Sequence, residues 1–240
     1  MRMDPETRLK EIARENEIEI TEDHIGKLRI FIINLLRINK NINLISRNDE
    51  ANIWNKHIVG SLSILFVRNF VRPATILDLG TGGGFPGIPL AICLPDCKFV
   101  LMDSIQKKIV AVNEMISQLD LKNVETVVGR AETEGKKNAL RQQFDYVLAR
   151  AVGPAKDIVR WGSPFLKLSD KDRSKEPRDH SEKKTITPGS LVLMKGGVLD
   201  EEMKTVQIKY RPKSIEIIPL AFKGITTEDF VDKKIVIIQP

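Results

Sequence analysis

The residues that most clearly indicate a chemical function lie at 76–90, where a short apolar stretch ends in a carboxylate, Asp78. Glycines follow, and the chain then continues as an apolar, helix-like segment. This order predicts a strand, a tight turn and the start of a helix, the arrangement with which open α/β sheets hold nucleotides. A flexible loop is the alternative for glycines alone. The turn contains Gly80, Gly82 and Gly84.

A second carboxylate supports a nucleotide site. The next apolar run ends in Asp103, nineteen residues after Gly84, where a carboxylate accepts hydrogen bonds from both ribose hydroxyls. Gly82, Gly84 and Gly87 also fit the dinucleotide-binding fingerprint, whose helix N-terminus receives a pyrophosphate. Asp78 beside the turn would repel that anion, whereas it suits a ligand with a cationic end. S-adenosylmethionine, which has a sulfonium and an ammonium group, is therefore favoured over NAD.

Charged residues also follow the later strands. Arg130, Ala131 and Glu132 come after the third strand, where this fold places an adenine, although Ala131 and Glu132 also fit a plain helix start. Arg150 follows the fourth strand, and Lys195 follows the fifth. Open α/β sheets bind their ligands at this carboxyl edge, so Arg150 and Lys195 are candidate functional residues.

Strands alternate with helices from residue 74 onward, which predicts a parallel sheet covered on both faces. The last two strands have no helix between them and must pair antiparallel. This order matches the Rossmann-like, class I S-adenosylmethionine-dependent methyltransferase fold, with a seven-stranded and mostly parallel sheet. The expected strands are 74–79, 98–102, 124–128, 144–149, 190–194, 215–220 and 231–238. The expected helices are 87–94, 105–119, 155–166 and 199–210.

The first part of the chain, 1–72, is expected to form a helical extension packed on the methyltransferase core, 73–240. Its helices are predicted at 6–16, 22–40 and 50–70. The second of these keeps apolar residues at helical spacing and has Thr21 as its N-cap. A charged stretch at about 167–189 predicts a mobile surface loop within the core, with a basic flap over RNA as the alternative.

Composition narrows the possible functions. The net charge of +6 and the pI of about 9.2 are compatible with a polyanionic partner, although the excess charge is spread thinly along the chain. No apolar run approaches the roughly 18 residues of a membrane span, and no signal-peptide core follows the first methionine. Cys93 and Cys97 are too few for a metal site, so reduced thiols and a cytoplasmic setting are expected.

These motifs together resemble those of a known family, the bacterial small-subunit (16S) ribosomal RNA guanine-N-7 methyltransferases of the GidB (RsmG) type. The resemblance covers roughly residues 20–200, in the family's order and spacing. Its most specific parts are the glycine turn with its Phe-Pro-Gly-Ile-Pro-Leu continuation and the His-Ile-x-x-Ser element. The matching residues are 43–46, 57–61, 78–89, 101–104, 107–108, 130–132, 150–151 and 195–196.

The resemblance implies methyl transfer from S-adenosylmethionine to N-7 of one guanine in a loop of the small-subunit RNA, usually by a monomer. Arg150 would face the target base as the catalytic residue, and Asp103 would hold the ribose. The implied cofactor-binding residues are Gly80, Gly82, Phe85, Asp103, Ala131, Glu132 and Arg150. The residues expected to meet RNA are Arg47, Lys107, Lys108 and Lys195, with His57 and Ser61 as further rim candidates.

Methylation at N-7 makes modest chemical demands, because this ring nitrogen has an in-plane lone pair and carries no proton. Neither a general base, nor a metal, nor a covalent cysteine is then expected, and alignment of the reacting atoms supplies on the order of 7 kcal/mol or more. Cysteine-dependent methylation of pyrimidine carbons is rejected, because Cys93 and Cys97 follow the first core helix. A small-molecule methyltransferase and a cofactor-binding regulatory module are the alternative functions.

Overall fold

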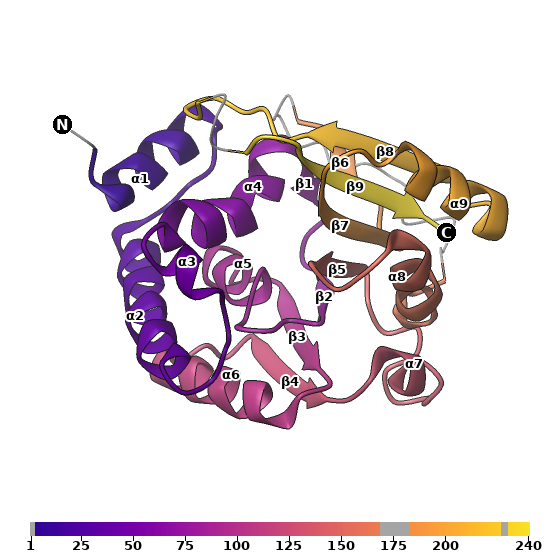
Figure 1. Cartoon of the computed structure of the whole chain (residues 1–240), viewed down its shortest axis with the longest axis horizontal. Helices are drawn as coiled ribbons and strands as arrows, with labels where there is room; N and C mark the ends of the chain where they lie inside the picture. The colour runs from indigo at the N-terminus through magenta and orange to yellow at the C-terminus, as the bar shows by residue number, and fades with distance from the viewer. Residues whose placement is uncertain (1–2, 169–182, 227–229) are drawn as a thin grey trace.

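The centre of the molecule is a seven-stranded sheet, shown in the computed structural model of Figure 1. The structure describes residues 3–168, 183–226 and 230–240. The strands of this sheet are β2 (Thr75–Leu79), β3 (Lys98–Asp103), β4 (Val124–Val128), β5 (Tyr146–Arg150), β7 (Ser190–Gly196), β8 (Ser214–Pro219) and β9 (Lys233–Gln239). Their order is β4-β3-β2-β5-β7-β9-β8, with β9 antiparallel to both of its neighbours and every other pairing parallel. The predicted parallel sheet with an antiparallel end is confirmed.

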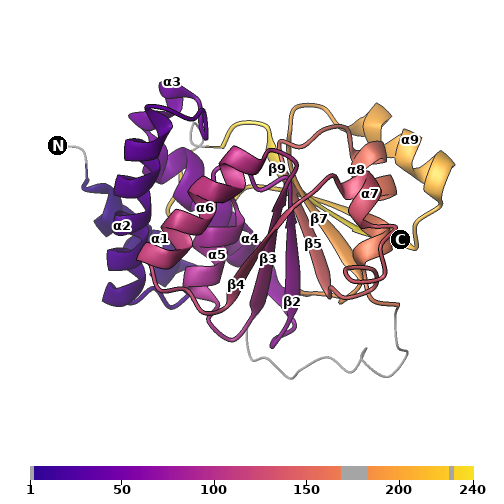
Figure 2. The same cartoon turned by 90° about the horizontal axis from the view of Figure 1, so that it is seen from below.

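Helices cover both faces of this sheet, as Figure 2 shows edge-on. One face carries α5 (Gly87–Cys93) and α6 (Gln106–Gln118), with the N-terminal helices packed outside them. The other face carries α7 (Ala131–Glu134), α8 (Ala155–Gly162) and α9 (Asp200–Tyr210). The predicted helix 155–166 ends as a short 3-10 turn, η2 (Ser163–Phe165).

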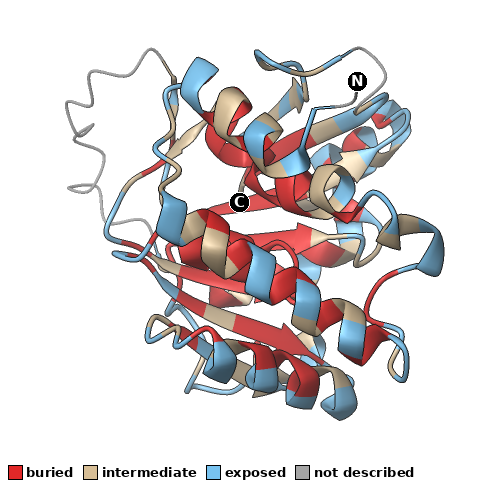
Figure 3. Cartoon of the chain, turned by 90° about the vertical axis from the view of Figure 1, so that its left-hand side faces the viewer, coloured by how far each residue is buried: buried red, intermediate tan, exposed pale blue. Residues whose placement is uncertain are grey.

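Two apolar layers hold the helices against the sheet. The central strands are buried on both faces (red in Figure 3), which explains why they read as nearly continuous apolar runs. One buried cluster joins Phe31 and Leu62 of the N-terminal helices to Phe99 of β3. A second cluster joins Val147 of β5 to Val206 of α9 on the opposite face. The N-terminal helices therefore share a core with the sheet.

The first two N-terminal helices match their predictions. They are α1 (Pro5–Glu15) and α2 (Glu22–Asn39). Thr21 caps α2 as predicted: its hydroxyl accepts the backbone N–H of His24, and the His24 ring accepts the backbone N–H of Thr21.

The helix predicted at 50–70 is confirmed over 53–67, but it is not one regular α-helix. The structure instead has α3 (Arg47–Glu50), a π-helix η1 (Trp54–Val59) and α4 (Gly60–Val67). A short strand follows, β1 (Asn69–Phe70), which pairs in parallel with β6 (Thr185–Ile186). The buried Tyr146 hydroxyl explains this pairing, because it accepts the N–H of Val71 and donates to the carbonyl of Ile186.

The predicted mobile loop at 167–189 falls largely on residues 169–182, which lie outside the described residues. Its described ends are attached to the core. Lys167 forms an ion pair with Asp145 at 2.9 Å, and β6 pairs with β1.

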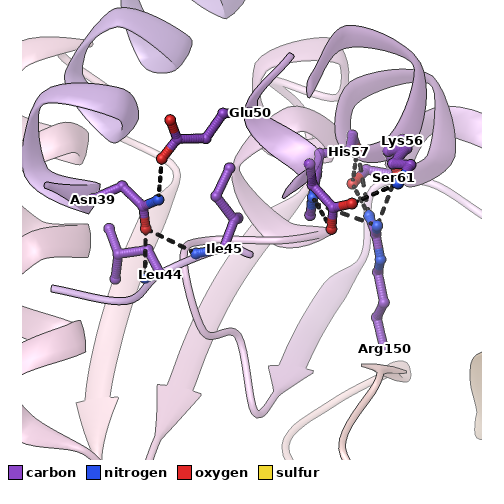
Figure 4. Close-up of polar contacts among 9 residues, drawn as sticks. Asn39, Leu44, Ile45, Glu50, Lys56, His57, Ser61 and Arg150 are labelled. Carbon is purple, nitrogen blue, oxygen red and sulfur yellow. Dashed lines mark hydrogen bonds and ion pairs between the residues drawn. The ribbon is translucent and has the colours of Figure 1, made fainter. Parts of the chain in front are cut away.

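The polar link between α2 and α3 depends on one buried amide, Asn39 (Figure 4). Its Oδ1 accepts the backbone N–H groups of Leu44 (2.8 Å) and Ile45 (3.0 Å), and its Nδ2 donates to Glu50 (2.6 Å). Buried backbone N–H groups need a partner, so this amide fixes the turn between the two helices.

The Asn39→Ala variant is expected to lose about 2 kcal/mol of unfolding free energy, because two buried N–H groups lose their acceptor. Urea denaturation measures this change. Asn34→Ala is the matched control on the same helix, since the Asn34 amide donates only to the Ile30 carbonyl at the surface. Equal urea midpoints for Asn39→Ala and Asn34→Ala would contradict the role assigned to the Asn39 amide.

Candidate active site

The glycine turn after β2 is organised around Asp78, which is wholly buried. Its Oδ2 accepts the Thr81 hydroxyl (2.7 Å) and the N–H of Gly87 (2.9 Å), the first residue of α5. The chain can turn back this sharply because its three glycines adopt positive φ. These angles are +75° at Gly80, +59° at Gly82 and +92° at Gly84.

The position of Asp78 decides which nucleotide suits the turn. Its carboxylate already occupies the N-terminus of α5, where a dinucleotide fold would place a pyrophosphate. Burial raises the pKa of Asp78 to about 6, and Oδ1 has no hydrogen-bond partner among the described residues. Because Asp78 is buried and hydrogen-bonded to Thr81 and Gly87, it shapes the turn from inside the protein.

A cavity of about 350 Å³, here called the cofactor cavity, opens beside this turn. Asp103 lines it from the end of β3, and its two oxygens accept the N–H groups of Gly82 (3.0 Å) and Ile105 (2.9 Å). A carboxylate has about four lone-pair sites, so it can still accept ribose hydroxyls. Four of the predicted cofactor residues line this cavity: Gly80, Asp103, Ala131 and Glu132.

The other walls of the cofactor cavity suit an adenosine. Apolar side chains supply a surface for a purine ring, and the Glu132 carboxylate supplies a second acceptor besides Asp103. Lys108, which was predicted to meet RNA, lines this cavity instead, because it lies one turn into α6 beside the end of β3. The apolar wall residues include Leu79 and Met102, which lie within the sequence motifs, and Val152 and Trp161, which lie outside them.

A second cavity of about 570 Å³, here called the target cavity, lies beside the first at the carboxyl edge of the sheet. Both cavities are lined by Ala151, which has a left-handed φ of +56° directly after β5. The target cavity draws Asp49 and His57 from the N-terminal helices and Arg150 from the core. It is therefore completed by the N-terminal extension.

Arg150 joins these two parts of the chain (Figure 4). One guanidinium nitrogen donates to the Ser61 hydroxyl (3.1 Å) and the His57 carbonyl (3.4 Å), and the other donates to the Lys56 carbonyl (2.8 Å). Both carbonyls belong to the π-helix, and the His57 carbonyl also accepts the Ser61 hydroxyl at 2.6 Å. Burial lowers the pKa of Arg150 from its usual value, while the charge of Asp78 opposes that shift.

The structure separates Arg150 and Phe85 from the other predicted cofactor residues. Neither lines the cofactor cavity, and the same holds for Gly82, whose N–H is bound to Asp103. The Phe85 ring is buried against His57, with ring centroids 4.8 Å apart, and the Arg150 guanidinium lies 5.9 Å from its centre. Phe85 thus packs against two residues that line the target cavity.

His57 also lies at the target cavity, as a neutral ring. Its Nδ1 is 3.5 Å from a guanidinium nitrogen of Arg150, which can only donate, so the proton belongs on Nε2. Nε2 lies 3.5 Å from Asp49 Oδ2. Burial and the charge of Arg150 lower the pKa of His57 to about 4.

The remaining predicted RNA contacts have different surroundings. The rim position predicted for Ser61 is wrong, because the residue is fully buried and holds Arg150. Lys195 lines the target cavity, but its ammonium is paired with Glu202 at 2.8 Å. Arg47, at the start of α3, and Lys107, at the start of α6, are both exposed.

Comparison with known proteins identifies the family. The family model GidB, described as rRNA small subunit methyltransferase G, matches residues 24–171, more than half of the chain. The chain belongs to the GidB family. This confirms the resemblance drawn from the sequence and the enzyme class, a methyltransferase whose methyl donor is S-adenosylmethionine.

Several curated GidB-family proteins are similar over most of their length, and each is named ribosomal RNA small subunit methyltransferase G. The Desulforamulus reducens protein is 34% identical over 210 residues, covering 88% of this chain and 78% of its own. The Phocaeicola vulgatus protein is 38% identical over 199 residues, covering 83% of each chain. The Flavobacterium johnsoniae protein is 42% identical over 166 residues, covering 69% of this chain and 70% of its own.

Solved structures share the fold at much lower identity. A predicted O-methyltransferase, Atu636, from Agrobacterium tumefaciens has a TM-score of 0.55 and 16% identity, covering 76% of this chain and 79% of its own. A fibrillarin/Nop5p complex gives a TM-score of 0.53 and 14% identity, covering 76% and 80%. Among the described residues, no helix is long and apolar enough to cross a membrane, and no cluster of three metal-ligating side chains occurs.

The low pKa of His57 predicts a pH dependence of stability. The folded-state value is about 4, against an ordinary value of 6.5, so between these pH values the unfolded chain binds a proton that the folded chain does not. The contribution of neutral His57 to stability is therefore fully present above pH 6.5 and is lost as the pH falls toward 4. Over that window, wild type should lose on the order of 2–3 kcal/mol relative to His57→Gln.

Urea denaturation of both proteins in half-unit pH steps measures this difference. Asp78, whose pKa is raised to about 6, contributes the opposite trend, and it cancels because both proteins contain it. Stability curves that run parallel across the window would show that His57 is not buried as a neutral ring.

Proposed function

We propose that this GidB-family enzyme transfers the methyl group of S-adenosylmethionine to N-7 of a specific guanine in small-subunit ribosomal RNA. One observation carries the proposal: two cavities of different chemistry meet at Ala151, at the carboxyl edge of the sheet. The first suits the adenosine of the methyl donor, and the second is large enough for a nucleotide. The names of the curated relatives support the RNA as substrate.

Charge distinguishes the two cavities. The described lining of the cofactor cavity balances Lys108 and Arg130 against Asp103 and Glu132. The target cavity has five cations against two carboxylates, Asp49 and Glu202. Its cations are Lys56, Arg150, Lys195, Lys233 and Lys234. Such an excess favours a polyanionic substrate over a neutral metabolite.

The side chains at the target cavity fit a methylation that needs no proton transfer. S-adenosylmethionine supplies an electrophilic methyl group on a sulfonium. His57 is a weak base at neutral pH, because its pKa is about 4 and its free ring nitrogen faces Arg150. Cys93 and Cys97 are buried at the opposite edge of the sheet, and burial raises their pKa values to about 12 and about 11, so neither acts as a nucleophile here.

The proposal assigns a role to the N-terminal extension, 1–72, relative to the core, 73–240. Asp49, Lys56 and His57 reach the target cavity from the extension, so it positions the base while the core holds the donor. We also propose that the enzyme acts as a monomer in the cytoplasm, where ribosomal RNA is assembled into ribosomes.

The direct test incubates the protein with labelled S-adenosylmethionine and one of three acceptors: small ribosomal subunits, protein-free ribosomal RNA or a metabolite extract. The expected product is a single N-7-methylated guanine in the RNA, located by borohydride reduction and aniline cleavage. Label that enters metabolites alone would overturn the proposal.

Arg150→Lys should lower methylation by about 100-fold, because one ammonium cannot replace the fork that holds the Lys56 and His57 carbonyls and Ser61 together. Affinity for S-adenosylmethionine, measured by calorimetry, should change by less than about threefold, since Arg150 does not line the cofactor cavity. Arg141→Lys, at an exposed position, is the matched control. A large loss of cofactor affinity would place Arg150 in the wrong cavity.

A further inference from the structure

A third cavity continues the target cavity away from the cofactor. It has a volume of about 970 Å³ and lies between the end of α4 and the connection from β8 to β9, which Figure 1 shows passing over α4 toward α1. The two cavities share four lining residues, so they lie side by side. The shared residues are Leu220, Phe230, Lys233 and Lys234.

Three aromatic rings follow one another along this third cavity. Phe66 lies 4.9 Å from Phe222, and Phe222 lies 5.9 Å from Phe230, measured between ring centroids. Phe66 comes from α4 and is buried, whereas Phe222 and Phe230 come from the β8–β9 connection and are half-buried. The Phe222 and Phe230 rings pack on their neighbours but remain partly open to the cavity, and accessible aromatic rings are the surfaces on which unpaired bases stack in single-strand-binding proteins.

The cavity is also positively charged. Its described lining holds four cations and one acid, Asp232. Arg68 is paired with Glu216, and the Lys234 ammonium donates to the neutral Gly197 carbonyl at 2.6 Å. Lys223 and Lys233 are exposed, and neither ammonium has a partner among the described residues. These two lysines, unlike Lys195 in its ion pair with Glu202, are available to phosphates.

We propose that the single-stranded RNA next to the target guanine lies along this third cavity, here called the aromatic groove. Its bases stack on Phe222 and Phe230, and its phosphates meet Lys223 and Lys233. The inference rests on the proposed function and adds the path of the substrate. RNA is the occupant that fits, because half-buried aromatic rings and exposed lysines without a partner among the described residues line the same groove, which adjoins the target cavity.

The test measures the salt dependence of RNA binding. Fluorescence anisotropy with a labelled single-stranded RNA compares wild type with the double variant Lys223→Ala/Lys233→Ala. Each lost phosphate contact lowers the slope of log affinity against log salt by about 0.7, so the variant slope should fall by about 1.4. Its KM for small ribosomal subunits should rise about tenfold, while the affinity for S-adenosylmethionine stays unchanged, because neither lysine lines the cofactor cavity.

The matched control is Lys98→Ala/Lys213→Ala. Both of these lysines are exposed at the amino edge of the sheet, opposite the cavities: Lys98 is the first residue of β3, and Lys213 precedes β8. If the Lys223→Ala/Lys233→Ala variant had the same salt slope as the control variant, the proposed RNA path along the aromatic groove would be overturned. The methylation assay on wild type tests the proposed function separately. A raised KM for subunits with unchanged binding of free RNA would mean that a protein of the particle occupies the groove, which also overturns the proposal.

Phe222→Leu tests the stacking part. Leucine keeps an apolar contact to Phe66 but removes the π-face, so affinity for single-stranded RNA should fall about fivefold or more at an unchanged salt slope. Thermal unfolding verifies that the variant is folded. Unchanged affinity in a folded Phe222→Leu variant would exclude stacking at this ring.

Discussion

The active site depends on one partly buried guanidinium. Arg150 ends β5, yet its hydrogen bonds go to Ser61 and to the Lys56 and His57 carbonyls of a π-helix that belongs to the N-terminal extension. A cation removed from water requires acceptors, and these groups of the extension supply them. Because the two partners lie far apart in the sequence, this contact fixes where the extension sits on the sheet. The shape of the target cavity follows from that placement.

A second buried charge organises the neighbouring cavity in a similar way. Asp78 binds the N-terminus of α5 from inside the protein, which closes that helix end to phosphates and leaves the turn to a ligand without a pyrophosphate. Asp103, one strand away, holds Gly82 while keeping lone pairs toward the cavity. The two carboxylates thus have different roles: Asp78 shapes the turn, and Asp103 faces the cofactor cavity.

The sequence predicts the core well and the extension less well. Each core strand is a short run of apolar residues bounded by glycine, proline or charged residues, and this local signal survives in the structure, as for β2 and β3. The π-helix, the β1–β6 pair and the ion pair that occupies Lys195 are absent from any local pattern. The first two involve hydrogen bonds to Arg150 and Tyr146 whose partners lie 94 and 40 residues away in the sequence, and Lys195 meets Glu202 because the chain turns back from β7 into α9. The glycine turn is a local signal that could be read from the sequence, and the predicted Arg150, His57 and Lys195 do line the target cavity. The burial of Ser61 and the pairing of Lys195 with Glu202 could not be read in this way.

The chemistry explains why so much of the structure serves placement. The proposed N-7 methylation needs neither a general base nor a nucleophile from the enzyme, because the guanine nitrogen is itself the nucleophile. The enzyme then has one main task, which is to hold that nitrogen in line with the methyl group. Such alignment tolerates little movement, so a base delivered by a long RNA must be restrained at the cavity and along its approach. Rigid attachment of the extension through Arg150 meets the first need. An apolar and cationic path leading away from the target cavity meets the second. The positive charges are spread thinly along the sequence, but the fold gathers several of them along this path.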